Sequence, residues 1–247
     1  MIDVAINAAR LAGDLALTYF KSQPKVSYKP DNTPVTIADK KAELLIREII
    51  SQKYPDHGII GEEFEPVNPL ARFKWVIDPI DGTKNFIRNL PLWCTLLAVL
   101  DADKPIVGIA YYPFASEMFT AQKGKGAYLN GKRTRVSKIK SVNQAVLNHN
   151  SLVRIEPRVP LANFMKLYKA VQTPRNLGSY SYNQLLKGNI DIDIVGTGGI
   201  WDFAAPAILV EEAGGKFTDF SGKFSLTSNS AVFTNGLLHS QVLNLLN

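Results

Sequence analysis

The apolar positions of the first fifty residues recur with the period of an α-helix. In 3–20 the apolar face is formed by Val4, Ala8, Leu11, Leu15 and Tyr19. A second helix is predicted over 37–53, where Thr36 is a candidate N-cap and Asp39 stands three residues later, as the acid of a capping box does. The polar, proline-marked segment between the two helices predicts a loop or a short hairpin.

Short apolar runs bounded by turn residues then predict strands. Two of them, at 57–60 and 74–77, are each followed by acidic residues. The next strands form a meander, in which Asn130-Gly131 is a strong hairpin-turn signal. The strands of the meander are predicted at 95–100, 106–112, 117–121 and 127–130.

The second half of the chain alternates between strands and helices. Strands are predicted at 145–148, 190–195, 216–219 and 231–234, and helices at 159–170, 179–187, 203–212 and 237–246. This pattern predicts an α+β first half followed by α/β layers. A soft boundary near 137–143 divides the chain into an N-terminal α+β subdomain, 1–140, and a C-terminal α/β subdomain, 141–247.

Composition narrows the class of protein. The 247 residues are 46% hydrophobic, enough for a sizeable core, and no apolar run is long enough to cross a bilayer. Charged residues interrupt the apolar pattern of the N-terminus, unlike a signal peptide, so a cytoplasmic protein is expected. The net charge of +6 suits anionic substrates and also nucleic acid.

The side chains that most often act as nucleophiles are poorly placed here. The one cysteine, Cys94, lies in an apolar run that predicts a strand, so a buried core thiol is favoured over a reactive thiolate. The histidines at 57, 149 and 239 are scattered, without metal-ligand spacing. The chain is therefore consistent with chemistry in which water attacks directly.

Carboxylates gather where predicted strands end. Asp78 follows the buried strand at 74–77, and Asp81 comes three residues later, because Pro79 forces an extended turn between them. Two carboxylates held so close repel each other unless a cation lies between them. Glu62 follows the preceding strand in the same way, and Asp202 opens a helix near the other end of the chain.

These four acids can converge on two or three divalent cations. Oxygen-only ligands favour Mg²⁺, with Mn²⁺ as a substitute, over Zn²⁺. Such a cluster can deprotonate a water and neutralise phosphate oxygens during in-line displacement. If a short helix begins after Asp81, the backbone amides of Gly82, Thr83 and Lys84 form an anion site beside the cations.

Three blocks of the sequence resemble signatures of the inositol monophosphatase superfamily. They are GEE at 61–63, DPIDGT at 78–83 and WDFAAPAILVEEAGG at 201–215, in the order and spacing of that family. The resemblance covers nearly the whole chain. It implies a layered αβαβα sandwich, a homodimer, inhibition by lithium, and Mg²⁺-dependent hydrolysis of a small phosphate ester.

The resemblance also implies a role for each site residue. Glu62 and Thr83 orient or activate the attacking water, and Asp39 polarises the threonine. The implied metal ligands are Glu62, Asp78, the Ile80 carbonyl, Asp81 and Asp202, with Thr83 completing the first site. The implied substrate contacts are Asp81, Gly82, Thr83, Gly178, Ser179 and Asp202.

Each acid also has a simpler interpretation. Asp78 and Asp81 occur in dipeptides that favour turns, Asp202 can cap a helix, and Glu62 with Glu63 can be a solvated pair. Metal binding is preferred for Asp78 and Asp81, because both follow directly on a fully apolar strand. For Asp39, stabilisation of a helix N-terminus and a catalytic role stay equally open.

The substrate stays open within the family. Lys84 stands where inositol-phosphate enzymes more often carry a small hydroxyl residue. In this feature the chain resembles histidinol-phosphate phosphatases and, in part, bisphosphate nucleotidases. Val195 stands where inositol-specific members usually place a glutamate that binds sugar hydroxyls. Inositol 1-phosphate and L-histidinol phosphate are both candidates, and a 3′(2′),5′-bisphosphate nucleotide or fructose 1,6-bisphosphate is a further one.

An alternative from another class is a protein that binds RNA or a transcription complex and retains the fold. Its motivation is the net charge and the basic stretch at 123–140. A solvated hairpin face is the simpler interpretation of this stretch. Four partly buried carboxylates without cations would also be costly in a pure binding protein.

Overall fold

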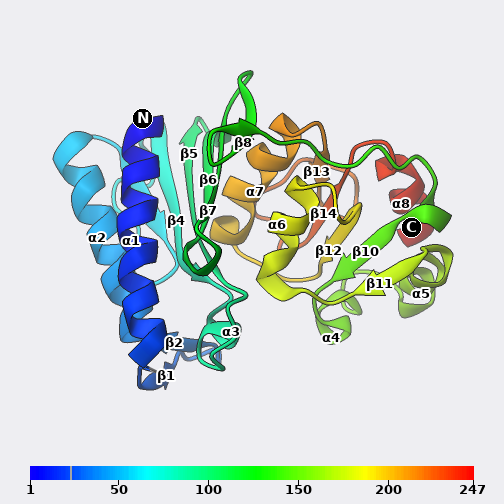
Figure 1. Cartoon of the computed structure of the whole chain (residues 1–247), viewed down its shortest axis with the longest axis horizontal. Helices are drawn as coiled ribbons and strands as arrows, with labels where there is room; N and C mark the ends of the chain where they lie inside the picture. Colours follow the sequence, from blue (N-terminus) through cyan, green and yellow to red (C-terminus); the bar gives the residue numbers. More distant parts are fainter. Residues whose placement is uncertain (23) are drawn as a thin grey trace.

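The computed structural model describes residues 1–22 and 24–247. Helices and sheets alternate in five layers, with two helices outermost on each side and two between the sheets (Figure 1). The outer pairs are α1 (Ile2–Ser22) with α2 (Ile37–Lys53), and α5 (Leu161–Ala170) with α8 (His239–Leu246); the inner pair is α6 (Ser181–Leu186) with α7 (Ile200–Glu212). The predicted αβαβα sandwich is confirmed.

The first sheet has seven strands in the order β3-β4-β5-β6-β7-β8-β9. β3 pairs in parallel with β4, and every other neighbour is antiparallel, so the predicted meander is confirmed. Asn130 and Gly131 turn β8 into β9 with positive φ angles of 48° and 79°. The strands are β3 (Gly58–Gly61), β4 (Phe73–Asp81), β5 (Cys94–Asp101), β6 (Lys104–Tyr112), β7 (Glu117–Gln122), β8 (Gly126–Leu129) and β9 (Lys132–Arg133).

The second sheet has five strands in the order β11-β10-β12-β14-β13. β10 is parallel to both of its neighbours, whereas β14 is antiparallel to β12 and β13. The strands are β10 (Val146–His149), β11 (Thr173–Arg175), β12 (Ile192–Val195), β13 (Lys216–Thr218) and β14 (Ala231–Thr234). Each sheet is built from one side of residue 140. The division into two subdomains stays a prediction.

Helix α7 joins the two sheets. Its central segment from Phe203 to Val210 is buried throughout, because the helix packs against strands of both sheets. Gly108 of β6 lets the helix come close, since a Cβ there would lie 2.5 Å from Cγ2 of Ile208 and 2.8 Å from the Ala205 carbonyl. The first-sheet strands, α7 and the second-sheet strands therefore share one continuous core.

Helix α1 was predicted correctly, but its predicted buried face was right only in part: Ala8 is fully buried, whereas Val4, Leu15 and Tyr19 are half-buried. The fully buried positions are alanines, and Leu11 is 45% exposed. Small side chains let α1 pack closely against α2 and β6, which turns the alanine face inward. Gly13 continues this close contact, because a Cβ there would lie 2.5 Å from the Tyr111 ring.

The remaining elements are short. β1 (Val26–Tyr28) and β2 (Pro34–Thr36) pair as an antiparallel hairpin in the predicted loop-or-hairpin segment. α3 (Thr83–Phe86) is the predicted short helix after Asp81, and α4 (Leu152–Ile155) was not predicted. No helix within 1–22 and 24–247 combines the length and the apolar character needed to span a membrane.

Candidate functional site

A bulge in β4 brings Asp78 and Asp81 together. Asp78 pairs with Leu96 of β5, but Asp81 pairs with Cys94, so one extra residue of β4 is accommodated between them. Residues three apart on a regular strand point to opposite faces, and a single extra residue restores a common face. Pro79 has no N–H to lose, and its carbonyl accepts a hydrogen bond of 2.9 Å from the Thr95 hydroxyl. The predicted turn is thus a bulged strand.

The third carboxylate arrives from the distant helix α7. Asp202 is its third residue, not its first as predicted, and its Oδ2 accepts a hydrogen bond from the Gly199 amide. Asp202 therefore caps the helix, as the capping interpretation expects, but it does so from a position within the first turn. Asp78, Asp81 and Asp202 each place one carboxylate oxygen within 4.8 Å of the others.

Burial makes this cluster electrostatically costly without a counter-ion. Burial is the largest cause that raises the pKa of all three acids, and their negative neighbours raise it further. Oδ1 of Asp78 is buried without a hydrogen-bond partner among the described residues. An unpartnered oxygen within a set of oxygen-only donors fits a hard divalent cation such as Mg²⁺.

Glu62 lies in the same cavity but pairs with a lysine. It directly follows β3, and its Oε1 lies 2.9 Å from Nζ of Lys29, which comes from the β1–β2 hairpin. The same Nζ lies 2.8 Å from Glu63, whose side chain is only 2% exposed. Burial, together with the negative charge of Glu62, raises the pKa of Glu63 to about 7. Sequence reasoning did not identify Lys29 as part of the site.

Thr83, Asp39 and Ile80 meet at the start of α3. The Thr83 hydroxyl lies 3.1 Å from the Ile80 carbonyl and 3.3 Å from Oδ1 of Asp39. Oδ2 of Asp39 accepts from the amide and hydroxyl of Thr36, which confirms the capping box. One oxygen of Asp39 therefore caps α2 and the other faces Thr83, while its catalytic role stays a prediction.

Ser179 connects the second half of the chain to Asp81 at the end of β4. Its hydroxyl donates a 2.9 Å hydrogen bond to Oδ1 of Asp81. Gly82 follows with a φ of 98°, and a Cβ there would lie 3.0 Å from the Ser179 hydroxyl. Glycine is therefore required for this close approach. The predicted Gly82 and Ser179 positions adjoin, with Gly178 next to them.

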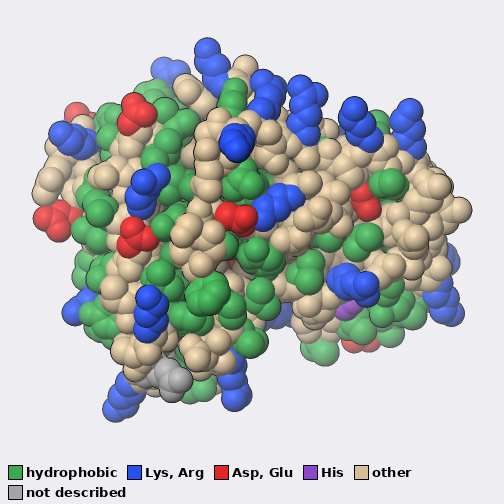
Figure 2. Space-filling view, viewed as in Figure 1, with side chains coloured by type: hydrophobic (Ala, Val, Ile, Leu, Met, Phe, Trp, Pro, Cys, Tyr) green, Lys and Arg blue, Asp and Glu red, His purple; other side chains and the backbone are tan. Residues whose placement is uncertain are grey.

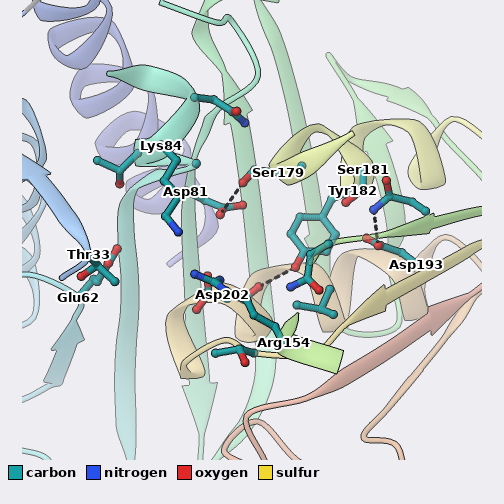
Figure 3. A pocket seen from close by; sticks show the side chains of 18 residues that line it. Thr33, Glu62, Asp81, Lys84, Arg154, Ser179, Ser181, Tyr182, Asp193 and Asp202 are labelled. Carbon is teal, nitrogen blue, oxygen red and sulfur yellow. Dashed lines mark hydrogen bonds between the residues drawn. The ribbon is translucent and has the colours of Figure 1, made fainter. Parts of the chain in front are cut away.

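A cavity of about 300 Å³ lies between the two halves of the chain (Figure 3). The predicted site residues that line it are Glu62, Asp81, Gly82, Thr83, Gly178, Ser179 and Asp202. Figure 3 places Glu62 and Asp193 at opposite sides of the cavity, with Asp81 and Asp202 between them. Lining residues that the sequence analysis did not single out are Thr33, Asn85, Asn148, Asn150, Arg154, Ser181, Tyr182, Asp193 and Thr197. They come from five separate segments, so only the tertiary fold brings them to the site.

The cysteine and the histidines at 57 and 239 pack against other residues of the fold. Cys94 is fully buried, and burial raises the pKa of its thiol well above the usual value, so it stays protonated. His239 is buried between the hydroxyls of Thr218 and Thr234. His57 stacks on Tyr54 and Phe73. The buried position of Cys94 agrees with the core role favoured from the sequence. The sequence favoured loop or surface positions for the histidines, and His239 is instead buried.

The basic stretch at 123–140 lies at the surface. Figure 2 shows a row of Lys and Arg side chains along the upper edge of this face, over β8 and the segment that follows it. Its exposed cations are Lys123, Lys125, Lys132, Arg133, Arg135, Lys138 and Lys140. Exposure fits a solvated face, and binding of RNA or a transcription complex stays a prediction.

Known proteins resemble this chain over most of its length. A histidinol-phosphatase from Mycobacterium tuberculosis is 37% identical over 90% of this chain and 88% of its own. Inositol monophosphatase 2 from Solanum lycopersicum is 34% identical over 100% and 97%. The solved structure of the Thermotoga maritima IMPase superposes with a TM-score of 0.89 at 32% identity, over 99% of this chain and 96% of that one.

The sequence profile of the inositol monophosphatase family matches residues 1–247, the full length given. The chain thus combines three acids whose oxygens lie within 4.8 Å of one another, a bulged strand that carries two of them, and the five-layer fold. Its relatives include phosphatases that are named for different substrates. The chain belongs to the inositol monophosphatase family.

Proposed function

We propose that the chain is a Mg²⁺-dependent phosphomonoesterase that hydrolyses a small phosphate ester by attack of water. The observation that supports this most is the convergence of Asp78, Asp81 and Asp202 within 4.8 Å, with a buried oxygen of Asp78 left without a partner among the described residues. Family membership supports the phosphatase activity. Inositol 1-phosphate and L-histidinol phosphate are the first substrates to test.

The metal ligands in this proposal are Glu62, Asp78, the Ile80 carbonyl, Asp81 and Asp202. When bound, two or three Mg²⁺ ions supply positive charge that neutralises phosphate oxygens and lowers the pKa of a nearby water. Mn²⁺ is the expected substitute, because it accepts the same oxygen ligands.

The protein groups then orient the reactants. Thr83, held by the Asp39 carboxylate, positions the water, and Glu62 accepts its proton once Lys29 no longer occupies the carboxylate. The Gly82 and Thr83 amides bind the phosphate, and Ser179 holds Asp81 in place. These amide donors, together with bound cations, would balance the charge on the phosphate.

Substitution of the converging acids tests the proposal. Asp81→Asn and Asp202→Asn keep the shape of each side chain but remove a ligand charge, so Mg²⁺-dependent phosphate release should fall by at least about 100-fold in each. Release from p-nitrophenyl phosphate, inositol 1-phosphate and L-histidinol phosphate is the measurement.

Asp101→Asn is the matched control. Asp101 ends the neighbouring strand β5 and pairs with Arg72 at the surface. This variant should retain wild-type turnover. Unchanged turnover in both Asp81→Asn and Asp202→Asn would remove the proposed mechanism.

A further inference from the structure

A buried carboxylate that the proposed mechanism does not use lies in the cavity wall. Asp193 on β12 is 0% exposed. Its Oδ1 accepts a 2.7 Å hydrogen bond from the Asn148 amide, but its Oδ2 has no hydrogen-bond partner among the described residues. No Lys, Arg or His of residues 1–22 and 24–247 forms an ion pair with it. Asp193 is therefore half satisfied.

Such a group is unusual because it carries charge. Burial raises the pKa of Asp193 to about 6, although hydrogen bonding from Ser181 and Asn148 acts to lower it, so the carboxylate is mainly ionised at neutral pH. An ionised oxygen away from water is strongly unfavourable unless a donor or a cation compensates it. The protein supplies neutral donors, the Asn148 amide and the nearby Ser181 hydroxyl, but no cation of the described residues pairs with Asp193.

The Asn148 amide is held in a fixed orientation. Its Oδ1 accepts a 2.7 Å hydrogen bond from the Leu177 backbone amide, so its Nδ2 is directed to Asp193. Asn148 is itself 1% exposed and lines the cavity. The pair is thus rigid, and Asn148 cannot turn to satisfy the second oxygen as well.

The neighbour of Asp193 on the cavity side is apolar. Val195 lies two residues later on the same strand, so both side chains belong to one face of the sheet, and both line the cavity. This wall offers Asp193 as a charged acceptor beside the apolar Val195, and Asn148, Asn150 and Thr197 line the same cavity. In Figure 3, Asp193 lies across the cavity from Glu62, with Asp81 and Asp202 between them.

We propose that Asp193 binds a cationic nitrogen on the alcohol part of the substrate, so that the preferred substrate class is the phosphate monoester of an amino alcohol. This proposal rests on the proposed phosphatase function. A cationic N–H donor compensates the buried carboxylate more strongly than a hydroxyl does. Val195, in contrast, accepts no hydrogen bond from the hydroxyls of a polyol.

The test compares two esters in one variant. L-Histidinol phosphate carries an amine on its alcohol part, whereas the leaving group of p-nitrophenyl phosphate carries no N–H donor. In Asp193→Asn, kcat/KM for L-histidinol phosphate should fall about 10- to 100-fold more than kcat/KM for p-nitrophenyl phosphate, chiefly through KM, because one charge-assisted hydrogen bond is lost. Equal losses for the two esters, or no loss, would overturn the proposal.

Asp191→Asn is the matched control. Asp191 is also a buried carboxylate next to β12, but its oxygens accept from the Ser137 hydroxyl and the Val146 amide. It should leave the ratio of the two kcat/KM values unchanged. Wild-type protein should also prefer L-histidinol phosphate to inositol 1-phosphate, and the reverse preference by about tenfold would contradict the inference.

A binding measurement separates this inference from the proposed function. Calorimetric titration of Mg²⁺-loaded wild-type protein with L-histidinol should give binding that weakens about tenfold or more in Asp193→Asn. myo-Inositol should bind more weakly than L-histidinol. Failure of wild-type protein to hydrolyse p-nitrophenyl phosphate would remove the phosphatase proposal, whereas failure to bind L-histidinol would remove the Asp193 subsite.

Discussion

Several carboxyl groups of the site are buried close together, which lowers the stability of the folded protein. Asp78, Asp81 and Asp202 each place one oxygen within 4.8 Å of the others, and Asp78 leaves one oxygen without a partner among the described residues. Lys29 compensates Glu62 and Glu63, at one side of the cavity, but it forms no hydrogen bond to these three aspartates. The metal-free protein therefore carries an electrostatic penalty that a divalent cation removes.

This penalty predicts how stability depends on pH. Folding raises the pKa of these acids, so between the ordinary carboxyl pKa near 4 and the raised value the folded protein binds more protons than the unfolded chain. The free energy of unfolding therefore falls as pH rises through that window. With a chelator present, Tm should be lower at about pH 8 than at about pH 5.5. Mg²⁺ should raise Tm more at the higher pH, because its ligands must be deprotonated.

Differential scanning fluorimetry with and without Mg²⁺ measures both effects. Asp202→Asn should flatten the chelator curve, since it removes one of the raised pKa values. A chelator Tm that rises between these pH values, or an Mg²⁺ shift that does not depend on pH, would contradict the electrostatic account.

At the scale of elements, a short hairpin controls access to Glu62. β1 and β2 present Lys29, whose Nζ contacts both Glu62 and Glu63. Burial works against the lysine charge, yet the two carboxylates raise its pKa above the ordinary value, so it stays cationic. If Glu62 is a metal ligand, as we propose, Lys29 and the cation compete for the same carboxylate.

Removal of Lys29 tests this competition. In Lys29→Met, the Mg²⁺ concentration for half-maximal binding should fall about 5-fold, because a partly buried ion pair worth about 1 kcal/mol no longer has to be broken. Titration of Mg²⁺ against Tm measures it. Lys25→Met makes the same change on the exposed approach to β1 and should have no effect. Weaker Mg²⁺ binding in Lys29→Met would show that the lysine assists the ion.

Local sequence signals predicted most elements, because their causes lie close in the chain. Thr36 and Asp39 identified the start of α2, and Asn130-Gly131 identified the turn into β9. The extension of β4 through Pro79 was missed, because it depends on pairing with β5. Strand β11 was missed for a similar reason, since three residues carry no visible period.

The three converging acids of the site were predictable from the sequence, but the cavity wall that contains Asp193 and Asn148 was not. Each of Asp78, Asp81 and Asp202 follows a local signal at the end of a strand or the start of a helix. Asp193 lies inside a strand, where an acid usually faces solvent. Only the pairing of β10 with β12 brings Asn148 beside it and shows that it is buried. Such contacts depend on tertiary structure and leave no short-range pattern.

At the scale of the whole molecule, α7 determines both the packing and the site. It lies between the two sheets, and its first turn carries Asp202 to the carboxylates of β4 (Figure 1). Gly108 sets the distance between α7 and β6. Stability and metal affinity should therefore be coupled through this one contact.

Gly108→Ala tests the coupling. Its Cβ would overlap Ile208 and the Ala205 carbonyl, so the free energy of unfolding should fall by about 1–3 kcal/mol, and Mg²⁺ affinity should fall as α7 shifts. Gly13→Ala is the matched control, because its Cβ overlaps Tyr111 on the opposite face of the same sheet. It should lower stability without changing Mg²⁺ affinity. Equal affinity losses in both variants would argue against a specific role of α7.

The position of Asp202 in the chain has a consequence for synthesis. Residues 1–140 contain Asp78, Asp81 and the whole seven-stranded sheet, yet the acid that completes their cluster comes from about four-fifths of the way along the sequence. A nascent chain on the ribosome would thus expose an incomplete ion site until α7 emerges and docks. Phosphate release during refolding would accordingly time this last docking step, rather than the earlier formation of the sheet.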